Sequence, residues 1–165
     1  MNADVEETIN RVWDVVGKAG ICMLTTHAIE GLRARPMEAR PDRESETIWF
    51  LTDRRGLKDD EAQAHPDVCL CFFHSDENVY LSLTGKASVE QDPERARSLW
   101  NKKQKAWWDG PNDPNLLVMR VDLMRAEMWD GPASSTVAAF EFARARKTGQ
   151  KPDLGENRKK TVDFQ

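Results

Sequence analysis

The sequence predicts a mainly β fold, an antiparallel barrel or split barrel of six strands with flanking helices. Six segments rich in β-branched and aromatic residues follow one another, mostly as candidate hairpin partners. Helical patterns are inserted between them without the regular strand–helix alternation of a parallel sheet. A length of 165 residues fits one domain, residues 1–165, with a C-terminal helix and tail over 134–165.

The composition excludes several functional classes. Apolar residues make up 39% and charged residues 32% of the chain, which is typical of a globular protein. The net charge is −4, so we expect no nucleic-acid binding, and any anion site must be local. No apolar run approaches the ~20 residues of a membrane span, and the acidic N-terminus lacks the layout of a signal peptide. We therefore expect no membrane association and a cytoplasmic location.

The cysteines favour packing over chemistry. Cys22, Cys69 and Cys71 are an odd number without paired spacing, which argues against a disulfide framework. Cys69 and Cys71 would point to the same face of a strand. Because no histidine or further cysteine lies at a matching spacing, we expect no metal site and interpret all three as buried packing residues.

The N-terminal region predicts a helix and then a buried strand. Residues 4–19 place apolar side chains at helical spacing, with acids early and a lysine late, as the helix dipole favours. Asp4 can cap this helix and Gly20 can end it. Residues 21–27 form the strand, and the terminal His27 can either line a cleft or be an ordinary polar end.

The next two segments predict an antiparallel hairpin. Residues 32–40 alternate as a strand does, and Pro36 places this strand at an edge or bulge because proline cannot donate to a sheet ladder. Residues 41–46 form a polar turn. Residues 47–52 form the partner strand.

The rest of the chain predicts three more helices and three more strands. Gly85 suggests a bulge in the fifth strand, and Asp92 caps the helix that follows it, with Pro93 at the first helical position. The tail is polar and can be an arm that crosses to a second subunit. In chain order the predicted elements are helix 57–64, strands 68–74 and 78–91, helix 92–105, strand 116–130 with a bend near Asp122, helix 134–147 and tail 149–165.

Four cations cluster near the ends of the predicted hairpin: Arg33, Arg35, Arg55 and Lys58. Arginine forks and a lysine point charge suit a phosphate group. Lys58 falls in the first turn of helix 57–64, where a cation is slightly unfavourable for the helix itself and is better explained by a bound anion. The alternative, that these are ordinary solvated strand ends, stays open on charge alone.

Two adjacent tryptophans, Trp107 and Trp108, lie in a loop with glycine and prolines. One surface cannot bury both, so we expect one to pack on its own domain and the other on a partner or ligand. Two tryptophans at the rim of the core are the alternative. Among motifs, no glycine-rich phosphate loop, zinc signature or hydrolase elbow occurs in the sequence.

Several short segments, in this order, are similar to a known family. They are RPM at Arg35–Met37, IWFLT at Ile48–Thr52 followed by Lys58, YLSLTGKA at Tyr80–Ala87, DPERARSLW at Asp92–Trp100, the G-x-x-DP run at Gly110–Pro114, AEMWD at Ala126–Asp130 and TGQKPDLGEN at Thr148–Asn157. The sequence thereby resembles the FMN-binding split-barrel proteins related to pyridoxamine 5′-phosphate oxidase, most closely the general stress protein 26 group.

The resemblance implies a homodimer of split barrels with FMN, or alternatively FAD, in a cleft between subunits. By the same resemblance, Arg35, Pro36 and Met37 would lie along the isoalloxazine ring. The other implied cofactor-binding residues are Phe50, Leu51 and Thr52 along the ring and ribityl chain, Lys58 at the phosphate, and Trp108 or Trp107 from the second subunit.

Two departures from the family pattern bear on function. Gly56 stands where family members commonly have a serine, so one donor to the phosphate is missing. The C-terminal segment that recognises pyridoxal phosphate in the true oxidases has no counterpart, so we do not transfer that activity. We expect an oxidoreductase that acts through the flavin on a small redox substrate or NAD(P)H, with no side chain assigned as catalytic. The alternatives are a non-catalytic flavin-sequestering stress protein and a barrel that has lost its ligand.

Overall fold

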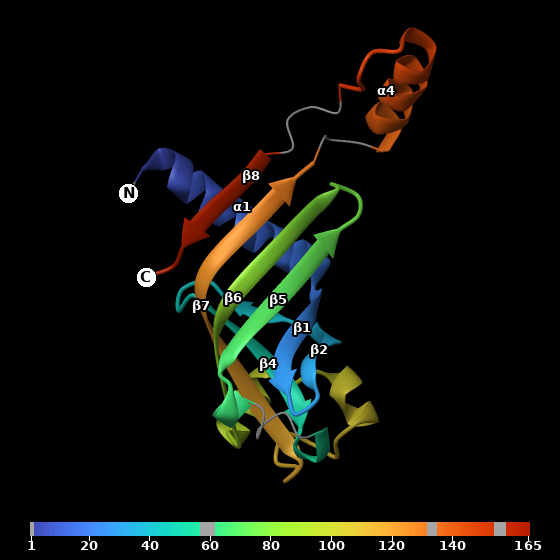
Figure 1. Cartoon of the computed structure of the whole chain (residues 1–165). Coiled ribbons are helices and arrows are strands. Elements are labelled where there is room, and N and C mark those ends of the chain that lie inside the picture. Colours follow the sequence, from blue (N-terminus) through green and yellow to red (C-terminus); the bar gives the residue numbers. More distant parts are fainter. Residues whose placement is uncertain (1, 57–61, 132–134, 154–157) are drawn as a thin grey trace.

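A computed structural model describes residues 2–56, 62–131, 135–153 and 158–165 (Figure 1). Within them, eight strands form one antiparallel sheet with flanking helices, which confirms the predicted fold class. The elements are α1 (Ala3–Ala19), β1 (Ile21–Ala28), β2 (Gly31–Glu38), β3 (Arg40–Asp42), β4 (Thr47–Asp53), η1 (Arg54–Gly56), β5 (Asp67–His74), β6 (Val79–Glu90), α3 (Pro93–Leu99), η2 (Lys102–Ala106), β7 (Leu116–Asp130), α4 (Ser135–Thr148) and β8 (Arg158–Asp163).

The predicted number of six strands is wrong, because β3 and β8 were expected as a turn and a tail. The three residues of β3 pair with β4 in the stretch interpreted as a polar turn. The polar sequence of β8 pairs with the second half of β7. Val162 is the apolar residue that β8 buries, at 5% exposure, so the alternation that marks a strand was too weak to recognise.

The sheet is closed into a barrel by the chain itself. Its strand order is β2-β1-β5-β6-β7-β4-β3, so β2 and β3 lie at opposite ends of the order. Only Ala39 separates them in sequence. The N–H of Ala39 donates to the carbonyl of Gly20 at 2.8 Å, next to β1, whereas the following Arg40 already lies opposite Trp49 of β4. The sheet must therefore curl until its two ends meet at Ala39.

The long strand β7 pairs with different strands along its two halves. Its first half pairs with β4, its second half pairs with β8, and β6 runs along both halves. The β6–β7 register shifts between Thr84 and Gly85, so Met124 is the extra residue of a bulge. A Cβ atom on Gly85 would lie 2.3 Å from the backbone oxygen of Asp122, which explains the glycine. The predicted bulge at Gly85 is confirmed.

Helix α1 completes the core. Its buried Val12, Val15 and Val16 belong to the same apolar cluster as the inward-facing side chains of the strands. The predicted helix is confirmed, including its end at Gly20, which has a φ of 69°. The cap, however, is Asn2 rather than Asp4: the Asn2 side chain accepts a hydrogen bond from the N–H of Asp4.

The predicted helix 92–105 is interrupted. Asp92 caps α3 as expected, but α3 ends at Leu99 and Trp100 is extended. The Asn101 side chain accepts from the N–H of Lys103, and the Gln104 side chain accepts from the N–H of Asn101. This reciprocal capping starts the separate short helix η2.

The last helix, α4, is inserted between the neighbouring strands β7 and β8 and lies beyond their ends, away from the barrel (Figure 1). Its Phe140 and Phe142 are exposed. Among the described helices, none is both long enough and apolar enough to cross a membrane.

Candidate functional site

The two strands singled out by the sequence face each other across a break in the barrel. Arg40 of β3 lies opposite Trp49 of β4, and continuing this register backwards would place Met37 opposite Thr52. Strands β2 and β4 do approach each other, but within the described residues no ladder joins them. We call this break, bounded by residues 35–38 and 50–53, the split. It brings together all of the predicted flavin residues except Lys58 and Trp108.

The side chains at the split divide between the core and the break. Phe50 is fully buried and Met37 is 8% exposed, and both belong to the main apolar core. Pro36 is exposed and lies on β2, which pairs with β1 alone, so the predicted edge position is confirmed. For Phe50, only the backbone remains for a ligand in the split, because its ring fills the barrel.

Thr52 carries the most informative polar atom of the split. The residue is 2% exposed, and its Oγ1 has no hydrogen-bond partner within the described part of the chain. A buried polar group left in this state costs about 1–3 kcal/mol. Such an atom is well explained when a ligand supplies the missing partner.

Arg35 is held by the neighbouring strand. Its Nη2 donates a hydrogen bond to Oγ1 of Thr26 on β1, and Thr26 is buried. Arg35 is half-buried, so its guanidinium is held against β1 rather than extended into bulk solvent. Thr26 lies near the end of the predicted strand 21–27, where the sequence allowed polar side chains to line a cleft, but its contact with Arg35 was not predicted.

The four predicted cations are not all brought together. Arg33 is exposed on β2. Arg55 turns back to Asp53, with its Nε 2.8 Å from Oδ1 and its Nη2 2.5 Å from Oδ2, and this bonding raises the pKa of Arg55. Lys58 and most of the predicted helix 57–64 lie outside the described residues. Of these four cations, Arg35 is the one that is partly buried within the described residues.

The two tryptophans have different environments. Trp108 is half-buried and packs with Leu51 and Trp100 on a second apolar cluster, formed by Trp49, Ala96, Leu116 and Val118. Trp107 is 64% exposed, and its ring centroid lies 6.4 Å from that of Trp108. Trp108 thus packs on its own chain beside a split residue. Trp107 is the tryptophan with a surface left for another molecule.

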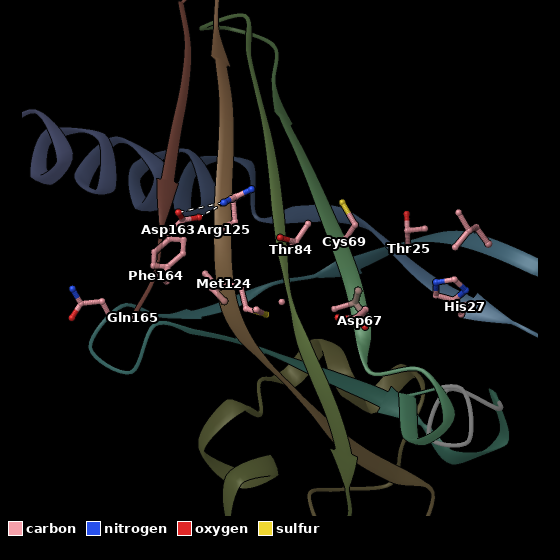
Figure 2. A pocket seen from close by; sticks show the side chains of 14 residues that line it. Thr25, His27, Asp67, Cys69, Thr84, Met124, Arg125, Asp163, Phe164 and Gln165 are labelled. Carbon is pink, nitrogen blue, oxygen red and sulfur yellow. Dashed lines mark hydrogen bonds and ion pairs between the residues drawn. The ribbon is translucent and has the colours of Figure 1, made fainter.

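A pocket of about 900 Å³ lies elsewhere, on the outer face of the sheet (Figure 2). A row of paired residues crosses it from strand to strand: Thr25, Cys69, Thr84, Arg125 and Asp163. Arg125 closes one side through a 2.6 Å ion pair with Asp163, which lowers the pKa of that carboxyl. No predicted flavin residue lines this pocket, so it is separate from the split.

The interpretation of all three cysteines as buried is wrong for two of them. Cys22 is 2% exposed, as expected, and burial raises the pKa of its thiol to about 12. Cys71 is exposed and Cys69 is half-buried, and their Sγ atoms are 3.7 Å apart. The physical reason is the period of two along β5: Val68, Leu70 and Phe72 face the core, so the residues between them face outward. The spacing of two correctly predicted that Cys69 and Cys71 share one face of the strand, but it did not predict that this face points outward.

Comparison with known proteins agrees with this architecture. The model of the "Pyridoxamine 5'-phosphate oxidase like" family matches residues 7–153. General stress protein 26 of Bacillus subtilis (strain 168) is 28% identical over 79 residues, which are 46% of this chain and 56% of that protein. The chain thus spans about half the length of this relative.

Solved structures extend the likeness to the whole fold. A protein of Jannaschia sp. CCS1, named as a general stress protein 26, superposes with a TM-score of 0.73 at 24% identity, covering 97% of this chain and 99% of that one. The general stress FMN/FAD binding protein from Xanthomonas citri gives a TM-score of 0.70 at 27% identity, covering 78% and 92%. With its split barrel and the match over residues 7–153, the chain belongs to the pyridoxamine 5′-phosphate oxidase-like family.

Proposed function

We propose that this chain is a stress-related protein that binds a flavin in the split, with FMN as the ligand and FAD as the alternative. The observation that carries the proposal is the buried hydroxyl of Thr52, which has no partner within the described residues. A flavin in the split would supply that partner. Family membership and the name of the Xanthomonas citri relative, an FMN/FAD binding protein, support the same ligand class.

The proposed roles follow the positions of the residues along the split. Arg35, Pro36 and Met37 border the isoalloxazine ring, and the half-buried guanidinium of Arg35 favours negative charge on it. The backbone of Phe50 and the side chains of Leu51 and Thr52 border the ring and ribityl chain. Lys58, which lies outside the described residues, is proposed from the sequence motif to hold the phosphate.

When bound, a flavin supplies redox chemistry, and the residues of the split bind it, orient it and exclude water. We propose that the protein acts through the flavin as an oxidoreductase, with NAD(P)H or a small molecule as its redox partner, and assign no catalytic side chain. A flavin-sequestering protein without turnover is the second candidate, because it needs the same pocket. We also propose a cytoplasmic location.

A homodimer is part of the proposal. The split is walled by β2 on one side and β4 on the other. Trp107, 64% exposed beside the second apolar cluster, is an aromatic side chain that a second subunit can bury. We propose that Trp107 of one subunit helps to cover the flavin of the other.

Flavin titration tests the proposal directly. The purified protein is first stripped of any bound flavin. It is then titrated with FMN and with FAD while flavin fluorescence is followed. We expect saturable quenching at micromolar concentration, and no quenching by either flavin overturns the proposal. Addition of NAD(P)H to the loaded protein then separates the two candidates: bleaching of the yellow colour supports an oxidoreductase, and a yellow protein that no donor bleaches supports sequestration.

A further inference from the structure

Two thiols on the outer face of β5 lie close enough to bind one ion together. The Sγ atoms of Cys69 and Cys71 are 3.7 Å apart. Cys71 is exposed and Cys69 is half-buried, so both can be reached from solvent. Figure 2 shows the sulfur of Cys69 pointing along the strand, away from Asp67. Neither residue lies at the split, and the proposed flavin function does not use them.

The direction of Cys69 follows from its contact with the next strand. Its Sγ lies 3.4 Å from Oγ of Ser82 on β6. Ser82 is the cross-strand partner of Cys71, whereas the partner of Cys69 itself is Thr84. The Cys69 side chain therefore leans by one row toward Cys71. The two sulfurs converge on one patch of the sheet.

A third sulfur belongs to the same patch. Met23 of β1 is the direct cross-strand partner of Cys71 on the side opposite Ser82. Directly opposed residues of an antiparallel pair have Cβ atoms about 4.5–5.5 Å apart and point to the same face. Met23 is 43% exposed, so its thioether is not committed to the core. The patch thus offers two thiols and one thioether.

The ligand set selects the type of ion. Thiolate and thioether ligands favour Cu(I), which is satisfied by two or three sulfurs, whereas a structural zinc ion takes four ligands. Among the described residues, no group of three histidines, cysteines or carboxylates is placed to hold a metal ion. Two thiols and one thioether fall short of the four ligands of a structural zinc ion, and such a sulfur patch suits a soft monovalent cation better.

The local charge does not oppose a cation. The row of paired residues through Cys71 holds no lysine or arginine; it runs Pro36, Met23, Cys71, Ser82, Glu127 and Thr161. Arg125, two strands from Cys69 in the neighbouring row, is engaged with Asp163.

We propose that Cys69 and Cys71 bind one Cu(I) ion per chain, with Met23 as a weaker third ligand. Two S–Cu bonds form, each thiol releases its proton to solvent, and the ion keeps its oxidation state. The proposal is independent of flavin binding.

The test is a titration of the reduced full-length protein with Cu(I) under anaerobic conditions, in competition with a chromogenic Cu(I) chelator. We expect one equivalent to be withdrawn from the chelator. Cys69→Ser and Cys71→Ser each lower the affinity by more than about tenfold, and Met23→Leu lowers it less. Cys22→Ser is the matched control, because it removes the buried thiol of the same chain and leaves binding unchanged.

Three outcomes overturn the proposal. The first is a Cys69→Ser/Cys71→Ser double variant that binds Cu(I) as tightly as the unmodified chain. The second is a loss of Cu(I) affinity in Cys22→Ser as large as that in Cys71→Ser. The third is an affinity for Zn(II) equal to that for Cu(I). Circular dichroism of each variant checks its fold. Because Cys71 is exposed, Cys71→Ala is a second variant that preserves packing, and it has to reproduce the loss seen with serine.

Discussion

The hydroxyl of Thr52 is buried without a hydrogen-bond partner in the described chain. Thr52→Val removes it at nearly constant shape. We expect the flavin-free protein to keep its stability or gain up to about 1 kcal/mol, because a desolvated polar group disappears. Flavin affinity should fall about three- to tenfold, because the ligand loses a hydrogen bond. Urea denaturation of the flavin-free protein and fluorescence titration measure the two effects.

Thr47→Val is the matched control for this change. Thr47 lies on the same strand and is fully buried, but its Oγ1 is 2.6 Å from Oγ of Ser45. Its replacement should lower stability by about 1 kcal/mol and leave flavin affinity unchanged. If Thr52→Val binds flavin as tightly as the unmodified chain, the Thr52 hydroxyl is not a ligand.

Lys58 is the residue proposed to bind the phosphate. Lys58→Ala should weaken FMN about tenfold or more, since a hydrogen bond to a charged group is worth about 1.5–3 kcal/mol. Riboflavin lacks the phosphate and should bind unchanged. Parallel titrations with the two flavins measure the difference, and Lys86→Ala, on the outer face of β6, controls for the loss of one positive charge. An equal loss for both flavins would show that Lys58 does not contact the phosphate.

Gly56 is the departure from the family pattern next to this lysine. A Cβ atom at Gly56 would meet no atom within 4 Å, so a larger side chain fits there. Gly56→Ser should therefore raise FMN affinity by up to about tenfold, because its hydroxyl can donate to the phosphate. Gly56→Ala should leave it unchanged. Weaker FMN binding by the serine variant would count against a phosphate site beside Gly56.

At the scale of elements, ion pairs fasten α1 to the sheet. Glu77, in the turn between β5 and β6, lies 2.6 Å from both Lys18 and Arg11 of α1. Hydrogen bonds from Lys18 and then Arg11 lower the pKa of Glu77 from 4.5 to about 2. Because the folded pKa lies below the unfolded one, this stabilisation is present above about pH 4.5 and is lost as the pH falls toward 2.

Glu77→Gln should therefore be less stable than the unmodified chain at pH 7 and equally stable near pH 2. Urea denaturation across this pH range measures the difference. Glu44→Gln, at an exposed glutamate of the β3–β4 turn, controls for the loss of one negative charge. A stability difference that persists unchanged at pH 2 would rule out the ion pairs as its cause.

The elements that the sequence predicted are those with strong local signals. The spacing of Val12 and Val16 predicts α1, and Gly85 predicts the bulge, because each pattern lies within one segment. The strand β8 could not be predicted, since it depends on pairing with a strand about thirty residues earlier in the chain. The sequence also did not show that Cys71 faces outward, because a period of two does not say which face of a strand meets the core.

At the scale of the whole molecule, the proposed homodimer gives a test. Trp107→Ala should shift the protein from dimer toward monomer and weaken flavin, because an exposed aromatic anchor is lost from the interface. Light scattering after size exclusion measures the mass, and Ile29→Ala, at an exposed residue of the β1–β2 turn, is the control. A monomer with full flavin affinity would contradict the proposed interface.

The barrel and its split were predictable to different degrees. Hairpin signals gave the fold class, and the family motifs pointed to Arg35–Met37 and Phe50–Thr52 as neighbours of one ligand. The closure of the sheet through Ala39 was not predictable, because it follows from the three-residue strand β3. The inward direction of the Phe50 ring and the packing of Trp108 on its own chain could be seen only in the tertiary structure.

The single residue between β2 and β3 gives the split the shape of a wedge. Ala39 is its vertex, because the strands are hydrogen-bonded from Arg40 onward and separate on the other side. Strand β4 runs away from this vertex toward Asp53. A flat ring suits the narrow end and a chain with a bulky charged head suits the wide end. For the flavin that we propose, such a wedge would allow one sense of insertion, with the ring at the narrow end and the phosphate at the wide end.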